Sequence, residues 1–233
     1  VNPIFKEVFS RPAAAAKSSM TAIEYLAENK AEKILNFSGG THHGRKSFAS
    51  GFCFLNDCIL AILKAKELNF KKIVYIDIDA HHCDAVQDHF IEDENVYIIS
   101  IHENNKWPRT GNIQDCHISN IINVPVPENF NDSEMMFIIE QFICPVALKL
   151  NPDLVIIQAG ADCLEDDPQS KMKLTNFSYW NAISKLKDIT KKTLILGGGG
   201  YNPYVTAKAW AGNWLVLNDK EYYLFVNSSN QKK

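Results

Sequence analysis

Apolar residues occur along the chain in short continuous runs that alternate with longer stretches of helical spacing. The short runs are rich in Ile, Val and Leu and hold no Gly or Pro, a pattern typical of strands buried in a parallel sheet. The predicted strands are Lys33–Phe37, Lys72–Ile76, Asn95–Ile101, Ile121–Val124, Leu154–Ala159 and Thr193–Leu196. The predicted helices are Ala13–Asn29, Asn56–Leu68, Asp84–Phe90, Asp132–Leu150, Asn176–Lys187 and Ala207–Leu217. This alternation predicts an α/β fold.

The length of 233 residues is consistent with one α/β domain that spans residues 1–233 and buries a sizeable core. Hydrophobic residues make up 46% of the chain and charged residues 22%, values that are ordinary for a soluble globular protein. The polar stretch 227–233 is predicted to be a disordered tail. Because the chain begins without Met and without an obvious first strand, we expect a fragment or a processed chain.

The net charge limits which binding partners are expected, and the cysteines indicate the cellular compartment. The formal net charge is -3, which argues against a nucleic acid or an anionic membrane as a partner. No apolar run is long enough to span a bilayer, and no secretory signal is evident. The six cysteines have no paired spacing, so they are interpreted as reduced thiols in a cytoplasmic protein.

The predicted strand Lys72–Ile76 runs into a dense cluster of three carboxylates and two imidazoles between Asp77 and Asp84. So many ionisable groups at a buried strand end are costly unless a cation compensates them. If the strand continues, Asp77, Asp79 and His81 project to one side. Asp79 and His81 then supply an oxygen and a nitrogen ligand, a set that suits Zn²⁺ or Fe²⁺. The plainer alternative is that the acids cap the next helix.

Catalytic zinc usually takes three protein ligands and keeps one position for water. A third ligand is therefore expected elsewhere in the chain. The predicted strand Leu154–Ala159 leads into Gly160-Ala161-Asp162, which makes Asp162 the candidate. The acidic residues 165–167 that follow are interpreted as a solvated turn.

His42 and His43 follow another strand end and come directly after a pair of glycines. Ligands bind at such strand ends in open α/β sheets, and glycine lets the backbone approach them. Asp77 and Asp84 remain available once Asp79 and His81 have bound a metal. Two His–Asp dyads are the economical pairing, and each would hold an imidazole in one tautomer.

Three aromatic residues are candidates for the walls of a site. Four glycines precede Tyr201, and this flexible turn would bring Tyr201 close to a metal-bound substrate. The same turn lacks the residues of a phosphate-binding loop. Phe52, taken alone, is interpreted as a core residue at a helix start. Trp107 lies in a predicted loop, and the pattern is equally consistent with two roles: it lines a substrate channel, or it packs on the surface of the core.

Five motifs together resemble the successive signatures of the histone deacetylase superfamily, in its order and spacing. They are Gly39–His43, Ala49–Cys53, Tyr75–His82, Gly160–Asp162 and Gly197–Tyr201. The runs Ser100–Glu103 and Gly200–Pro203 are most similar to the bacterial acetoin-utilization-type deacetylases. The likeness extends over about residues 2–217. It implies the arginase/deacetylase fold, a three-layer structure with a mostly parallel sheet flanked by helices.

The resemblance also implies an activity, the removal of an acetyl group from acetyl-lysine in a protein or peptide, or from a small N-acetyl amine. The implied metal is zinc, with iron as an alternative, and the implied roles fall on the following residues. The metal ligands are Asp79, His81 and Asp162; the dyads are His42–Asp77 and His43–Asp84, with His43 as proton shuttle; and Tyr201 binds the substrate carbonyl. The channel is lined by Gly51, Phe52 and Trp107, and a structural potassium ion is bound by Asp77, Asp79, His81 and Ser100.

Some positions depart from the family pattern. The family domain is longer at its N-terminus, and the acidic rim residue that grips substrate falls at Val1 or before it. Cys83 replaces a usual Gly, Trp107 a usual Phe, and Gln169-Ser170 a usual Leu-Gly. Two alternatives stay open: a binuclear manganese ureohydrolase, which needs paired acids that the Asp162 strand end lacks, and an inactive or regulatory ligand-binding protein.

Overall fold

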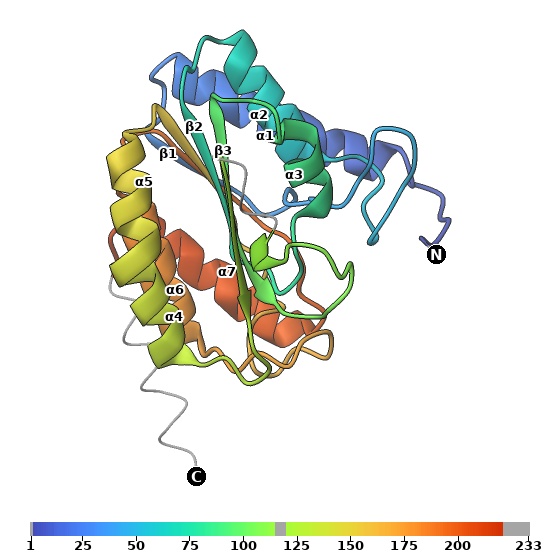
Figure 1. Ribbon diagram of the computed structural model, residues 1–233. Coiled ribbons are helices and arrows are strands. Elements are labelled where there is room, and N and C mark those ends of the chain that lie inside the picture. Colours follow the sequence, from blue (N-terminus) through green and yellow to red (C-terminus); the bar gives the residue numbers. More distant parts are fainter. Residues whose placement is uncertain (1, 115–119, 221–233) are drawn as a thin grey trace.

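The computed structural model describes residues 2–114 and 120–220, so the predicted tail at 227–233 lies outside the described residues. Its centre is a six-stranded sheet in the order β1-β6-β5-β2-β3-β4, in which every neighbouring pair is parallel (Figure 1). The strands are β1 (Lys33–Asn36), β2 (Ile73–Asp77), β3 (Val96–Glu103), β4 (Ile121–Val126), β5 (Leu154–Gln158) and β6 (Thr193–Leu196).

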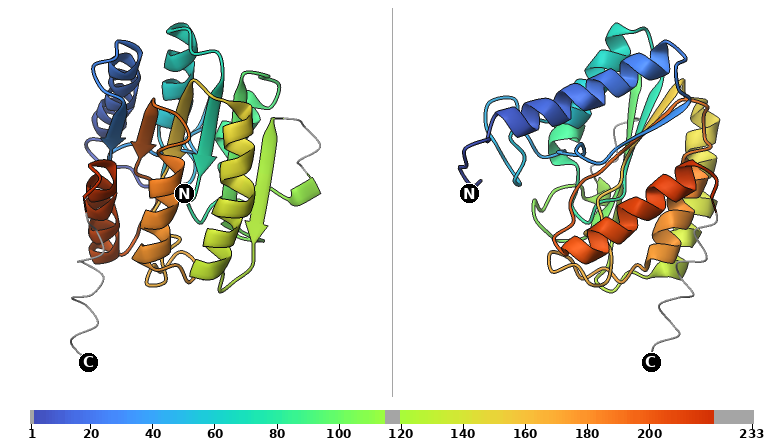
Figure 2. Two further views of the ribbon diagram at one scale, coloured as in Figure 1. Left: turned by 90° about the vertical axis from the view of Figure 1, so that its left-hand side faces the viewer. Right: turned by 180° about the vertical axis from the view of Figure 1, so that it is seen from behind.

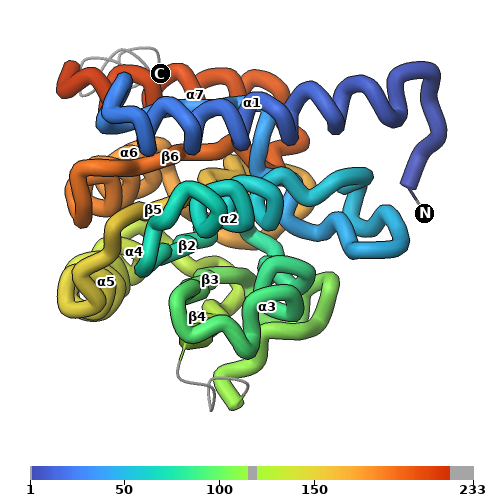
Figure 3. Tube along the Cα trace, turned by 90° about the horizontal axis from the view of Figure 1, so that it is seen from above, coloured from blue at the N-terminus to red at the C-terminus, as the bar shows by residue number. Residues whose placement is uncertain are grey.

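Helices cover both faces of this sheet, which makes three layers (Figure 2). One face carries α1 (Ser10–Ala27), α2 (Asp57–Glu67) and α3 (Asp84–Phe90). The other carries α4 (Asp132–Ile138), the π-helical turn η2 (Ile139–Ile143), α5 (Cys144–Leu150), α6 (Asn176–Leu186) and α7 (Pro203–Leu217). Seen from above, the sheet separates α2 and α3 from α5 and α6 (Figure 3). The predicted α/β architecture is confirmed.

The hydrophobic core lies in two layers because successive strand residues project to opposite faces. On β2, Val74 and Ile76 join the cluster under α4–α7, whereas Ile73 and Tyr75 join the cluster under α1–α3. All four side chains are fully buried. A central parallel strand is therefore apolar on both faces, which explains why the sequence pattern identified it so clearly.

Several helices differ in detail from the sequence prediction, and for two of them the local sequence gives the reason. The last helix begins at Pro203 rather than Ala207, because Asn202 caps it and proline is tolerated in the first turn. The predicted helix Asp132–Leu150 is continuous but contains the π-helical turn η2. That turn ends two residues before Pro145, whose missing N–H disrupts the regular α-helical hydrogen bonding.

The order of the strands creates a switch point between β2 and β5. From β2 the chain proceeds outward through β3 and β4, and it then returns to β5 on the opposite side of β2. In open α/β sheets, ligands bind beyond the carboxyl ends of the strands at such a point. The loops after β2 and β5 therefore meet where a site is expected. No helix in residues 2–114 and 120–220 is long and apolar enough to cross a membrane.

Candidate active site

Strand β2 ends at Asp77, so the condition under which strand alternation would align Asp77, Asp79 and His81 is not met. The carboxylate of Asp77 accepts the backbone N–H of Asp79 at 3.1 Å, and Asp79 in turn accepts the backbone N–H of His81 at 3.0 Å. These local side chain to backbone bonds compete with strand pairing and turn the chain. The loop, rather than an extended strand, brings Asp79 and His81 together.

Asp79, His81 and Asp162 form a buried cluster whose ligand atoms all lie within 4.8 Å of one another. The Nδ1 atom of His81 is 2.9 Å from Asp162 Oδ2 and 3.1 Å from Asp79 Oδ1. The loops after β2 and β5 supply these groups from the two sides of the switch point. It is the one cluster of at least three such ligands in the part of the chain that the structure describes.

This cluster is short of positive charge. Burial lowers the pKa of His81, but its hydrogen bonds to Asp162 and Asp79 outweigh that effect and raise the pKa to about 10. Burial and the charge of Asp79 raise the pKa of Asp162 to about 6. Two carboxylates thus share one imidazole in a buried place. A donor set of one nitrogen and two carboxylates fits Zn²⁺ or Fe²⁺, whose charge would compensate it.

Neighbouring groups orient the carboxylates of the cluster. Gln158 at the end of β5 donates its side-chain amide to Asp79 at 2.9 Å, and the backbone N–H of Gly199 donates to the same oxygen at 2.8 Å. Gly160 has no room for a larger residue, since an added Cβ would lie 2.0 Å from an Asp79 oxygen. The sequence pattern did not indicate Gln158, which looked like one more residue of an apolar strand.

His42 belongs to a dyad built on the sheet itself. Its Nδ1 lies 2.7 Å from Oδ2 of Asp77, and the Tyr75 hydroxyl donates to that oxygen at 2.6 Å. The other ring nitrogen, Nε2, is 3.9 Å from Asp79 Oδ1. Burial lowers the pKa of His42, but the charges of Asp77 and Asp79 more than reverse this and raise it to about 9.

His43 belongs to a second dyad, built on a helix start. Its Nδ1 lies 2.7 Å from Oδ1 of Asp84, the first residue of α3. Arg45 donates to the other oxygen of Asp84 at 2.6 Å and also pairs with Asp88. Burial and the neighbouring His42 lower the pKa of His43 to about 4 despite its bond to Asp84. These two pairs are the ones that the family resemblance implies; their catalytic roles stay predictions.

The loop that carries both imidazoles is organised by the start of α2. The buried carboxylate of Asp57 accepts the backbone N–H groups of Gly40 at 3.0 Å and Thr41 at 2.8 Å. Asn56 donates its amide to the carbonyl of His42 at 2.9 Å. Neither role was predicted, although Asn-Asp at a helix start is a capping signal that points to nearby backbone N–H groups.

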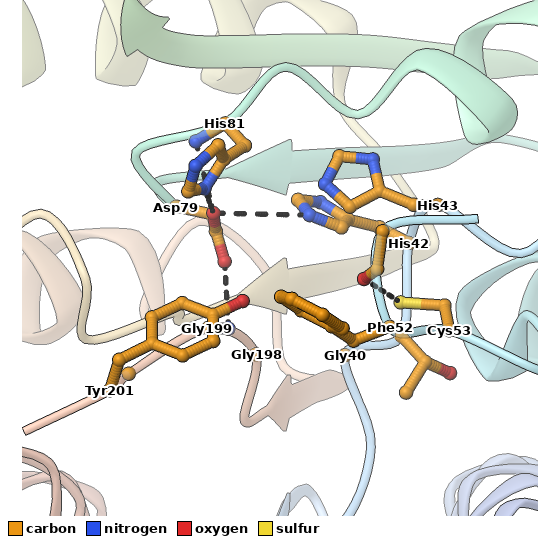
Figure 4. Close-up of a pocket in the computed structure, with 13 residues that line it drawn as sticks. Gly40, His42, His43, Phe52, Cys53, Asp79, His81, Gly198, Gly199 and Tyr201 are labelled. Carbon is orange, nitrogen blue, oxygen red and sulfur yellow. Dashed lines mark hydrogen bonds and ion pairs between the residues drawn. The ribbon is translucent and has the colours of Figure 1, made fainter. Parts of the chain in front are cut away.

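Tyr201 lies at the cavity beside Phe52, with ring centroids 6.1 Å apart (Figure 4). Its backbone N–H, and that of Asn202, donate to one oxygen of Asp167 at 2.6 and 3.2 Å. Asp167 is buried whereas Glu165 and Asp166 are exposed, so the expectation of a solvated turn is wrong for Asp167 alone. Burial and the charge of Asp79 raise the pKa of Tyr201 above its usual value, which keeps the phenol protonated.

A cavity of about 220 Å³ lies over the ligand cluster, and an outer chamber of about 270 Å³ continues it toward the surface. Both are lined by His43, Gly51, Phe52, His81 and Tyr201. The outer chamber adds Asn2, Trp107 and Gln169. The three residues predicted to line a channel therefore lie along one continuous space.

Phe52 and Trp107 face this space rather than the core. Phe52 is 56% exposed, so its interpretation as a core residue from local pattern alone is wrong. Trp107 is 45% exposed and packs edge-on against His43 with ring centroids 4.5 Å apart. A Cβ on Gly51, whose φ is +53°, would lie 2.4 Å from the Trp107 ring and 2.6 Å from His43, so only glycine fits.

Ser100, predicted as a potassium ligand, is opposite Asp77 on the adjacent strand β3 and is fully buried. Its hydroxyl is 2.9 Å from the Nδ1 of His102. The potassium site itself stays a prediction. The cysteines within the described residues, Cys53, Cys58, Cys83, Cys144 and Cys163, are free, as their spacing predicted.

Residues 1–217 match the family model for the histone deacetylase domain. The chain is 36% identical to Histone deacetylase 8 of Xenopus laevis over 214 residues, which are 89% of this chain and 66% of that protein. It is 32% identical to Histone deacetylase 8 of Danio rerio over 214 residues, which are 89% of this chain and 56% of that one.

The crystal structure of an HDAC homolog from Aquifex aeolicus matches with a TM-score of 0.88 and 32% identity, covering 94% of this chain and 60% of that chain. This match to a bacterial protein is consistent with the similarity of two sequence motifs to those of bacterial deacetylases. The chain spans about two thirds or less of the length of these relatives. The parallel sheet and the loops at its switch point are thus those of an arginase/deacetylase fold, and the chain belongs to the histone deacetylase family.

Proposed function

We propose that the protein is a metal-dependent hydrolase that removes the acetyl group from N-acetyl-lysine or a related N-acyl amine. One observation carries the proposal: a single cavity is lined by two members of the Asp79–His81–Asp162 cluster, by the imidazole of a His–Asp dyad and by a protonated tyrosine. Amide hydrolysis needs an electrophile, a proton acceptor and a donor for the developing oxyanion. These groups supply all three.

Asp79, His81 and Asp162 would hold the metal, which we propose to be zinc, with Fe²⁺ as the alternative for the same donors. Such a metal, when bound, polarises an amide carbonyl and lowers the pKa of water. The protein orients the ligands in advance, because Gln158 holds Asp79 and the backbone N–H of Ala80 donates to Asp162 at 2.9 Å. Ser100 and Asp77 would contribute, with Asp79 and His81, to a structural potassium site.

His43 acts as the proton shuttle. Its Nδ1 is engaged by Asp84, and its Nε2 makes no hydrogen bond to the described part of the chain, so Nε2 accepts the proton of a water in the cavity. A pKa of about 4 keeps the ring neutral at pH 7 and therefore able to accept. The protonated ring then returns the proton to the leaving amine.

Tyr201 donates its hydroxyl to the substrate carbonyl oxygen as negative charge develops there. One such donor is usually worth about 3–4 kcal/mol of barrier. The raised pKa of Tyr201 favours the protonated phenol that donation requires. His42 pairs with Asp77 and, carrying a pKa near 9, supplies a positive charge beside the ligand Asp79.

The channel suits a slender substrate. Phe52 and Trp107 offer aromatic surfaces to an aliphatic side chain, and Gly51 has no side chain that would collide with His43 and Trp107. A lysine stem or a polyamine has this shape. Acetyl-lysine in a protein or peptide and a small N-acetyl amine are therefore the substrate classes that we propose.

The binuclear ureohydrolase alternative is not favoured by the geometry. A second metal needs a second group of ligands, and the described residues contain only the one cluster. Hydrolysis by a single metal fits that count better.

The test is hydrolysis of a fluorogenic acetyl-lysine peptide by the zinc-loaded protein. We expect His43→Ala to lower kcat by roughly 10²–10⁴-fold, the usual contribution of a general acid–base group. His89→Ala is the matched control, because His89 is an exposed imidazole on α3, and it should leave kcat within about twofold.

Acetylspermidine serves as a second substrate, so that peptide and small-amine specificities are told apart. A zinc-loaded protein that binds one metal per chain and hydrolyses neither compound would overturn the proposal in favour of a ligand-binding role.

A further inference from the structure

The carboxylate of Asp84 has two partners from the same loop. His43 engages Oδ1 at 2.7 Å, and Nη2 of Arg45 donates to Oδ2 at 2.6 Å. His43 and Arg45 are two residues apart in the loop between β1 and α2, whereas Asp84 begins α3. The second dyad is therefore a group of three residues in which a base and a cation share one carboxylate.

Arg45 is held in place from several directions. Its other terminal nitrogen pairs with Asp88, one turn further along α3. Its backbone N–H donates to the carbonyl of Phe48 at 3.1 Å, and its side chain is only 26% exposed. A planar guanidinium that bridges two carboxylates fixes both in angle as well as distance.

We propose that Arg45 is a positioning residue: it keeps the Asp84 carboxylate ionised and turned toward Nδ1 of His43, which leaves Nε2 as the nitrogen that accepts a proton. This inference deepens the proposed hydrolase function and rests on it for its effect on turnover. The position of the Asp84 carboxylate and the tautomer of His43 are, in contrast, properties of the folded chain that exist without substrate.

The physical reason is the burial of Asp84, which is 4% exposed. Burial raises the pKa of this carboxyl group, but its bond to His43 and the charge of Arg45 outweigh burial and hold the pKa at about 2. Without Arg45, one carboxylate oxygen is left buried and without a partner. Taking up a proton or turning away relieves that cost.

Either response changes His43. A protonated Asp84 donates to Nδ1 and drives the ring proton to Nε2, the tautomer that cannot accept a proton from water. A rotated Asp84 leaves the imidazole free to populate both tautomers. The loss of Arg45 thus acts on the base through Asp84, without any contact between Arg45 and substrate.

A purely structural role for Arg45 makes a different prediction. The ion pair between Arg45 and Asp88 also links the Arg45 loop to α3, and this exposed pair would affect stability without affecting His43. Asp88→Asn removes this fastening and keeps the bond between Arg45 and Asp84. Arg45→Lys keeps the charge, and Arg45→Gln removes it while keeping a polar side chain of similar length.

The experiment records ¹⁵N spectra of histidine-labelled protein, in which the signals of His43 are assigned by their absence from His43→Gln. We expect the Nδ1–H tautomer in the wild type, in Arg45→Lys and in Asp88→Asn, and a mixture of tautomers in Arg45→Gln. In the zinc-loaded enzyme, Arg45→Gln should lower kcat by about 10–100-fold with little change in KM, as for other outer partners of catalytic imidazoles. Arg45→Lys should restore most of the rate.

A wild-type tautomer and wild-type kcat in Arg45→Gln would overturn the proposal and leave Arg45 as a surface fastener. Equal effects of Asp88→Asn and Arg45→Gln on the tautomer would overturn it as well. If the wild-type protein hydrolyses no acyl amine, the proposed function fails, but the tautomer spectra still decide the position of Asp84 on their own.

Discussion

The two His–Asp dyads share one hydrogen-bond distance and differ in almost everything around it. The partner of His42 is Asp77, which ends the central strand β2, and the third member is the neutral hydroxyl of Tyr75. The partner of His43 is Asp84, which begins α3, and there the third member is the cation of Arg45. The pKa of His42 is raised to about 9, whereas that of His43 is lowered to about 4.

The difference shows that a carboxylate partner alone does not set the protonation state of a histidine. His42 faces two carboxylates, Asp77 and Asp79, so its cation is favoured even in a buried place. Burial lowers the pKa of His43 and the charge of His42 lowers it further, and together they outweigh the bond to Asp84, a carboxylate that also pairs with Arg45. Adjacent residues of one loop thus become a fixed charge and a neutral base.

The largest expected effect comes from exchanging the two rings for amides one at a time. His43→Gln should lower kcat by roughly 10²–10⁴-fold because it removes the proton acceptor. His42→Gln should cost about 10–100-fold because it removes only a supporting charge. Steady-state kinetics on an acetyl-lysine peptide with zinc-loaded protein measures both. Equal losses would show that the two dyads do the same work.

A second, smaller effect concerns stability against pH in the metal-free protein. The pKa of His42 rises from 6.5 to about 9 on folding, so its stabilisation is complete below pH 6.5 and is lost as the pH rises toward 9. The pKa of His43 falls to about 4, so its contribution is present above pH 6.5 and is lost as the pH falls toward 4. Each shift corresponds to at most about 3 kcal/mol.

Urea unfolding of chelator-treated protein between pH 4.5 and 9 tests this, with each His→Gln variant as the reference for its own ring. The stability difference between wild type and His42→Gln should shrink on the alkaline side, and that between wild type and His43→Gln on the acid side. Slopes of the same sign for both pairs would contradict the assignment of a cation and a neutral base.

The smallest effect separates the third members of the dyads. Tyr75→Phe removes a buried hydroxyl that donates to the Asp77 carboxylate, and we expect a loss of about 2 kcal/mol in unfolding free energy. Tyr97→Phe on β3 is the control, since Tyr97 is only partly buried, and it should change stability by less than about 0.5 kcal/mol. An unchanged unfolding free energy in Tyr75→Phe would show that the bond from Tyr75 to Asp77 does not stabilise the first dyad.

Local pattern predicted the strands, the helices and the residues at the strand ends, because burial on both faces leaves a strong apolar signal. It left the backbone after Asp77 open, because the alternation of Asp79 and His81 would suit a strand, whereas side chain to backbone bonds in fact bend the chain there. Bonds between adjacent loops and strand ends cannot be seen in such a pattern.

The same limit explains the partners that the sequence did not indicate. Gln158 ends an apolar strand and Asp57 begins a helix, so each already has an ordinary local explanation. Arg45 was given no role from the sequence, and Asp167 was interpreted as part of a solvated turn. Each forms a hydrogen bond with a residue between 17 and 79 positions away in the chain. Only the folded sheet defines those pairs.

Because the proposed metal ligands lie on the two sides of the switch point between β2 and β5, metal binding depends on the pairing of these two strands. Asp79 and His81 come from the first half of the sequence, and Asp162 comes from the second, 81 positions beyond His81. The three donors become a set only when β5 has aligned beside β2. A polypeptide interrupted before Leu154 has two donors and an open sheet centre, so tight binding of a cation would report that both halves have been made and joined.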